Sequence, residues 1–166
     1  GEIFSWEGGK HTPRVSERGV YPRPVNGKLP IWLAVGGTPQ SVGRAAMLGL
    51  PLALAIIGGE PARFAPFFKL YREAAEKFGR DPSTLKTSIN VHGFVGETRK
   101  EAVDTFYPAQ AEVMNRIGRE RGWPPTSRAQ FDASTGPKGA QFVGDPSAVT
   151  DKILANHEIF GFDRFV

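Results

Sequence analysis

An alternation of apolar runs with amphipathic helical segments constrains the fold of this chain more than any other feature of its sequence. Strand-like apolar runs lie at residues 31–35, 52–57, 85–95 and 162–166. Helix-like spacing of apolar residues is found at 39–48, 64–78, 103–117 and 146–160. Strands that alternate with helices imply right-handed crossovers and a parallel sheet. The predicted class is therefore α/β, either an open doubly wound sheet or part of a (β/α)₈ barrel.

Local signals mark where several of these helices begin and end. Thr38 precedes Pro39, so a threonine oxygen is placed to accept an unpaired N–H at the start of a helix whose first residue has none to lose. Gly49 stands just past the end of the same helix, where a left-handed residue is common. Thr98 and Glu101 form a T-x-x-E pattern, which predicts a capping box at the start of the third helix.

Two segments lack the alternation. Residues 1–30 are rich in glycine, proline and charge, and they predict an irregular or hairpin-like loop. Residues 118–142 show no clear periodicity and predict an insertion loop, of the kind that serves as a functional excursion or lid. The 166 residues fall short of the roughly 250 of a complete barrel, there is no initiator Met, and the last residues are strand-like. We therefore expect a single partial domain, a fragment of a longer chain.

Composition excludes several classes of protein. The chain has no cysteine, which rules out disulfides, thiolate metal sites and a cysteine nucleophile. Its net charge of +4 is spread along the sequence without a basic run, so we expect no nucleic-acid partner. Its longest apolar stretch, residues 48–57, contains Gly49 and Pro51 and is shorter than the roughly 20 residues of a membrane span. We expect a cytoplasmic protein with no membrane partner.

The glycine-rich turn after the first strand is the most informative segment. Gly36 and Gly37 would let the backbone approach a ligand closely, and the hydroxyls of Thr38 and Ser41 stand at the positive end of a helix. This combination is a candidate phosphate cradle. It matches neither G-x-G-x-x-G nor G-x-x-x-x-G-K-[ST], and the same residues also suit a tight, capped turn without a ligand.

One histidine has a position that suits a functional role. His92 lies near the end of the third strand, on its polar side, and active sites of (β/α)₈ barrels are built at the C-terminal ends of the strands. It is a candidate contact for a substrate or a flavin, although a lone histidine also suits a structural role. The three histidines show no metal-ligand spacing, so we predict no metal site.

Several motifs, in order, resemble the bacterial-luciferase-like flavin monooxygenase family. They are residues 29–41 (LPIWLAVGGTPQS), 44–46 (RAA), 49–51 (GLP), 70–72 (LYR) with Gly79, 142–146 (FVGDP) and 162–165 (FDRF). The resemblance covers nearly the whole chain. It implies a TIM barrel of which this sequence is the C-terminal half, about strands five to eight.

The resemblance also implies a cofactor and the residues that hold it. Its members use reduced FMN to activate dioxygen, so the chain is expected to belong to an FMN-dependent oxidoreductase, a monooxygenase acting on a small organic substrate. The implied cofactor-binding residues are Val35, Gly36 and Gly37 along the flavin chain and Thr38 and Ser41 at its phosphate. Where luciferases have an acidic residue, this chain has Gly37.

Two other functions remain open. Relatives in the family use a deazaflavin for hydride transfer, and others bind flavin without catalysis. No catalytic residue can be named, because the family's N-terminal half is missing from this sequence. We further expect a homo-oligomer.

Overall fold

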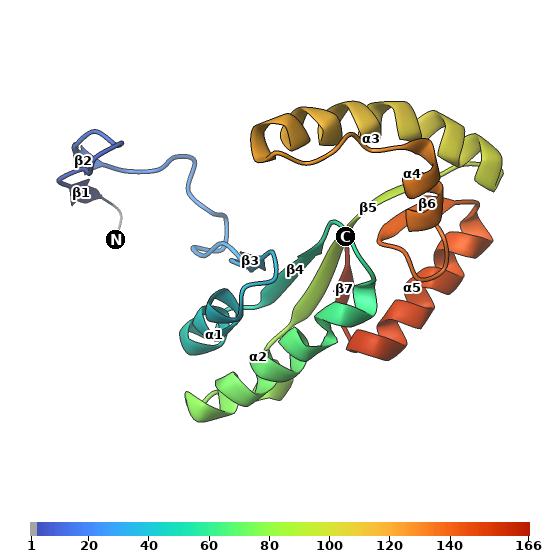
Figure 1. Cartoon of the computed structure of the whole chain (residues 1–166). Helices are drawn as coiled ribbons and strands as arrows, with labels where there is room; N and C mark the ends of the chain where they lie inside the picture. The colour runs from blue at the N-terminus through green and yellow to red at the C-terminus, as the bar shows by residue number, and fades with distance from the viewer. Residues whose placement is uncertain (1–2) are drawn as a thin grey trace. The chain divides into compact units, whose positions relative to one another are not determined.

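The computed structural model describes residues 3–166, and the chain divides into two compact units between Ile31 and Trp32 (Figure 1). The smaller unit contains an antiparallel hairpin of β1, Phe4–Trp6, and β2, Val15–Arg18. Phe4 pairs with Arg18 and Trp6 with Val15, with an irregular register between these pairs.

The larger unit is built on a parallel sheet. Its strands are β3 (Leu33–Val35), β4 (Leu52–Ile56), β5 (Thr87–Val95), β6 (Gln141–Gly144) and β7 (Arg164–Phe165). The order is β3-β4-β5-β6, with β7 paired to β5, and all of these pairs are parallel. The long strand β5 pairs with β7 at residues 88–89 and with β6 at 92–95. The four parallel strands predicted from the sequence are confirmed.

Five α-helices belong to this unit. They are α1 (Pro39–Leu48), α2 (Ala65–Lys77), α3 (Arg99–Arg121), α4 (Arg128–Ser134) and α5 (Pro146–Phe160), with 3₁₀ turns at Pro61–Phe64 and Pro82–Thr84. Gly49 ends α1 in the left-handed conformation at φ 65°, as predicted. Thr98 caps α3 through the Glu101 N–H, but the Glu101 carboxylate accepts from the Glu97 N–H, so the predicted capping box is only half formed.

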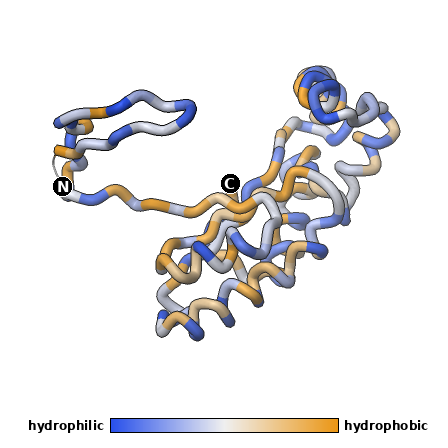
Figure 2. The backbone as a smooth tube through the Cα atoms, turned by 60° about the vertical axis from the view of Figure 1, so that its left-hand side comes forward, coloured by the Kyte–Doolittle hydropathy of each residue, from blue (hydrophilic) through white to orange (hydrophobic). Residues whose placement is uncertain are grey.

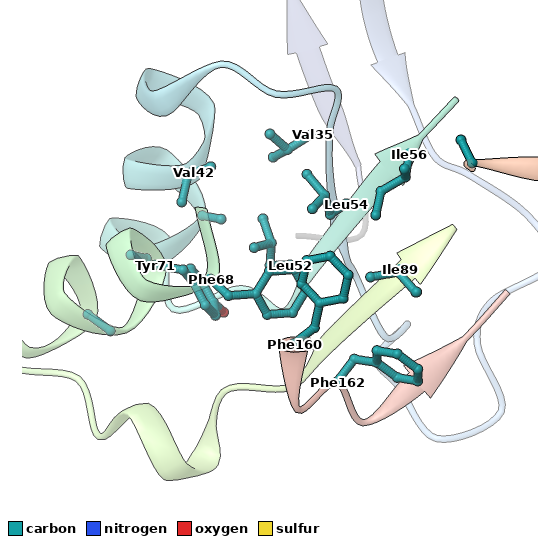
Figure 3. Packing of buried hydrophobic residues seen from close by; sticks show 14 residues of the cluster. Val35, Val42, Leu52, Leu54, Ile56, Phe68, Tyr71, Ile89, Phe160 and Phe162 are labelled. Atoms are coloured by element: carbon teal, nitrogen blue, oxygen red, sulfur yellow. The ribbon is translucent and has the colours of Figure 1, made fainter. Parts of the chain in front are cut away.

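The main core lies between the sheet and α1, α2 and α5. β4 alternates large residues with alanines, and its large residues all point to the helices, where they are fully buried (Figure 3). The aromatic side of α2 is core only in part: Phe68 and Tyr71 are each at most 2% exposed, whereas Phe78 is 50% exposed. The Tyr71 hydroxyl donates to the Leu50 carbonyl at 2.6 Å, and burial raises the pKa of Tyr71 to about 12. Figure 2 shows the alternation of hydrophobic and hydrophilic residues along these helices.

The segment 118–142 is more regular than its sequence predicts. It holds the end of α3, the whole of α4 and the start of β6. A second core cluster explains this order, because Phe131 of α4 is buried against Phe106 and Tyr107 of α3. The prediction of four strands and four helices was therefore one strand and one helix short.

Candidate functional site

The face of the sheet opposite the main core carries small and polar side chains. Register places Ala34, Ala53, Ser88 and Arg164 side by side across β3, β4, β5 and β7. Their sequence neighbours Leu33, Leu52, Leu54 and Ile89 pack into the helix-covered core, so these residues point the other way. We call this the inner face. It offers space beside alanines and hydrogen-bonding groups on β5.

The polar groups of the inner face follow one another along β5. The Asn90 amide donates to the Ser88 hydroxyl at 3.4 Å, and Ser88 is 2% exposed. His92 is half-buried, and its Nδ1 lies 3.0 Å from Nε2 of Gln110 on α3. When the Gln110 amide donates to Nδ1, the proton of a neutral His92 ring stands on Nε2. Gln110 therefore fixes which nitrogen of His92 is a donor.

Sequence reasoning missed Gln110 and Arg164. Gln110 stands 18 residues from His92, and only the position of α3 over the end of β5 brings them together. Arg164 lies on β7, and its guanidinium carbon is 5.9 Å from the centre of the Trp32 ring, a cation–π distance. The strand parity of β7 could have indicated that Arg164 faces away from Phe165, but a strand of two residues gives too short a pattern to read.

Thr38 and Ser41 lie together at the start of α1, where β3 ends. The Thr38 hydroxyl donates to the Ser41 hydroxyl at 2.9 Å, and both lie at the protein surface, Thr38 exposed and Ser41 half-buried. Thr38 occupies the N-cap position, as predicted, but its side chain accepts no backbone N–H. The prediction of a side-chain cap is wrong: the Thr38 hydroxyl bonds to the Ser41 hydroxyl instead of a backbone N–H of α1. The first turn of α1 contains no acidic residue, so its positive end is not offset by a side chain.

Of the residues just before Thr38, Gly36 leaves room at the backbone. Gly37 has a φ of 109°, and a side chain there would be strained, whatever the space. A Cβ on Gly36 would meet nothing within 4 Å. Val35 is 2% exposed and packs into the helix-covered core, so only its main chain is available to a ligand. The open backbone, two adjacent hydroxyls and an uncompensated helix N-terminus together fit an anionic phosphate.

The register also relates this turn to His92. Val35 is level with Leu54 and Ile89, and His92 lies three residues further along β5. Because the strands are parallel, the turn after Val35 and the His92 side chain both belong to the C-terminal edge of the sheet. The structure thus places the turn after Val35 and His92 at the C-terminal ends of β3 and β5, with β4 between these strands.

Residues 3–166 contain no group of three or more His, Asp or Glu side chains placed to hold a metal ion. None of the helices described is both long enough and apolar enough to cross a membrane.

A family profile described as luciferase-like monooxygenase matches residues 1–163 of the chain. No match was found among curated protein sequences. Solved structures do match. Monooxygenase RslO1 from Streptomyces bottropensis is 24% identical, with a TM-score of 0.64, over 99% of this chain and 48% of that one. The family resemblance seen in the sequence is confirmed.

Two further structures have related folds but different cofactors in their names. The oxygenating constituent of 3,6-diketocamphane monooxygenase from Pseudomonas putida, in complex with FMN, is 20% identical with a TM-score of 0.62, over 99% of this chain and 50% of that one. The coenzyme F420-dependent tetrahydromethanopterin reductase from Methanopyrus kandleri is 16% identical with a TM-score of 0.63, over 93% of this chain and 49% of that one. The chain thus spans about half the length of each of these three structures.

Proposed function

The chain belongs to the luciferase-like monooxygenase family, and from this premise we propose that it supplies the C-terminal half of the barrel of a flavin-dependent oxidoreductase. The proposed reaction is the oxygenation of a small organic substrate with reduced FMN and dioxygen. Reduced FMN, when bound, supplies the electrons for this reaction, and the protein supplies binding, orientation and exclusion of water. We further propose that the enzyme is cytoplasmic and homo-oligomeric.

The hydroxyl pair of Thr38 and Ser41 is the observation that carries this proposal. Two hydroxyls 2.9 Å apart at the start of α1 can turn toward one phosphate, and the helix dipole favours its negative charge. Gly36, where a Cβ would meet nothing within 4 Å, leaves the backbone accessible to the chain that joins the phosphate to the ring. We assign the phosphate of FMN to this turn.

The inner face is the proposed place for the reacting groups. Its alanines, Ala34, Ala53 and Ala55, leave space in front of the sheet. His92, with Nδ1 engaged by Gln110, would present its Nε2–H as a donor to the flavin or the substrate. In this role His92 orients a bound molecule and stabilises negative charge on it.

The phosphate assignment is tested by replacing both hydroxyls, Thr38→Ala with Ser41→Ala, in the full-length protein. Loss of hydrogen bonds to a charged phosphate should weaken FMN binding by about tenfold to a hundredfold. Riboflavin, which has no phosphate, should bind the variant nearly as well as it binds the wild type. Fluorescence titration of both ligands measures the two ratios.

A matched control is available on another helix. Ser147→Ala with Thr150→Ala removes the same two kinds of hydroxyl near the start of α5, where Asp145 provides the cap. This control should bind FMN as the wild type does. Unchanged FMN affinity in the Thr38 and Ser41 variant would place the phosphate elsewhere, and an equal loss for riboflavin would indicate general damage to the fold.

A deazaflavin enzyme is the second candidate. Two structures named as F420-dependent match this chain with TM-scores of 0.63, and the structure in complex with FMN matches it with a TM-score of 0.62. The turn that contains Thr38 and Ser41 suits the phosphate of FMN or that of a deazaflavin cofactor. Absorbance of the cofactor released from the purified full-length protein separates the two, since flavin and deazaflavin have different spectra. Oxygen consumption with reduced FMN then separates a monooxygenase from a protein that only binds flavin.

A further inference from the structure

A second cavity, of about 380 Å³, lies outside the proposed flavin site. It is bounded by the start of α3, the end of α4, strand β6 and helix α5. Much of its wall is apolar and comes from Val143, Ala148, Val149 and Ala155. None of the residues assigned to the flavin lines it.

Lys152 lines this cavity and carries a buried ammonium group. The residue is 7% exposed, and its ammonium donates to the carbonyls of Gly136 and Gln141, both at 2.7 Å. The same nitrogen lies 4.9 Å from the centre of the Phe142 ring. Among residues 3–166 no carboxylate lies within 4 Å of it, so its charge is solvated by dipoles alone.

A second cation lines the same cavity. Arg99 donates to the Thr135 hydroxyl at 3.1 Å and, within the described chain, forms no ion pair. Asp151 also lines the cavity, but its side chain is exposed and is paired with neither cation. The charged groups around the cavity therefore sum to about one positive charge.

The electrostatic surroundings of Lys152 also favour an anion in this cavity. Burial, and next the positive charge of Arg99, lower the pKa of Lys152 to about 8. A cation destabilised in this way gains from any anion placed beside it. An anion with a hydrocarbon body would in addition cover the apolar wall.

We propose that this cavity binds a small amphipathic monocarboxylate, whose carboxylate pairs with Lys152 and Arg99 and whose hydrocarbon body packs against Val143 and Val149. The net charge of the lining matches one carboxylate, and the apolar wall disfavours a strongly hydrated dianion such as phosphate. The site is separate from the flavin site and does not depend on which flavin is bound there.

The test uses hexanoate as the probe and the full-length protein, by calorimetric titration. Hexanamide, a neutral analogue of similar shape, and inorganic phosphate serve as the comparison ligands. Hexanoate should bind more tightly than either one, and Lys152→Met should weaken it about tenfold or more. Lys138→Met is the matched control, because Lys138 lies in the neighbouring loop but does not line this cavity, and it should leave the affinity unchanged.

Two milder variants keep the test decisive if Lys152→Met disturbs the fold. Arg99→Gln should weaken hexanoate binding severalfold, and Asp151→Asn should tighten it about twofold, because a repelling charge is removed. The flavin-site variant of Thr38 and Ser41 should bind hexanoate as the wild type does. Three results would overturn the proposal. They are hexanamide binding as tightly as hexanoate, Lys138→Met weakening hexanoate binding as much as Lys152→Met, and Asp151→Asn binding hexanoate more weakly than the wild type.

Discussion

At the scale of single residues, Asp163 joins the end of the chain to the middle of the sheet. Its carboxylate accepts from the Thr87 N–H and from the Lys86 ammonium, each at 2.8 Å. Its own N–H donates to the Thr87 carbonyl at 2.9 Å. Because β7 has only two residues, these bonds hold Arg164 in its place on the inner face.

Asp163→Ala should lower the free energy of unfolding by about 1 kcal/mol at pH 7, a value reduced because the carboxylate is partly exposed. Burial raises the pKa of Asp163, but the hydrogen bonds from Lys86 and Thr87 outweigh it and lower the pKa below 3.8. Its stabilisation is therefore present above pH 3.8 and is lost as the pH falls through the lowered pKa. Urea unfolding of the full-length wild type and variant at pH 7 and near pH 3 measures how much stability the substitution costs at each pH. Asp151→Ala is the control, and a cost that did not shrink in acid would contradict this account.

At the scale of elements, α4 depends on a capping box. The Ser127 hydroxyl accepts from the Gln130 N–H at 3.2 Å, and the Gln130 amide oxygen accepts from the Ser127 N–H at 3.0 Å. The pattern S-x-x-Q is visible in the sequence and could have predicted this helix. Phe131, 2% exposed, then fixes α4 against α3.

Ser127→Ala combined with Gln130→Ala should destabilise α4 by about 1 kcal/mol, because two N–H groups lose their partners. The amides of residues 128–134 should exchange with solvent faster, while those of α5 should not change. Hydrogen exchange measured by mass spectrometry on the full-length protein resolves the two helices. Equal acceleration in both helices would indicate global unfolding, and no acceleration in α4 would show that its other contacts, Phe131 packing and the Arg128–Asp104 ion pair, hold it without the capping box.

The elements differ in how much of them the sequence could predict. Strand β4 and helix α1 follow from strong local patterns, with alternating large residues in one and glycine and proline at the ends of the other. Strand β6 has only four residues, all buried, and its pairing with β5 joins residues about fifty positions apart. The contact between Gln110 and His92 depends on how α3 lies over β5, which no local pattern encodes. The hydroxyl pair at α1 was predicted by residue type, but not its internal hydrogen bond.

At the scale of the whole molecule, the sheet of residues 32–166 has edges that need a partner. Strand β3 pairs only with β4, and β7 pairs only with β5, so each has one side whose N–H and C=O groups lack a strand in this unit. The inner face is lined by small and polar residues and lies opposite the helix-covered core. A closed barrel would cover both edges and enclose this face.

The 166-residue chain produced alone should associate, because unpaired strand edges are templates for pairing with a second chain. Light scattering after size exclusion should give a mass above the 18.1 kDa of one chain, rising with concentration. Ala34→Lys places a charge on the edge strand β3, on the inner face, and should reduce association, whereas a lysine at the exposed helix position Ala109 should not. A monomer that unfolds in one cooperative transition at every concentration would show that the edges are already closed. If the chain associates but Ala34→Lys has no effect, the contact lies elsewhere than β3, and Arg164→Glu, which reverses a charge on β7, then tests the edge of that strand.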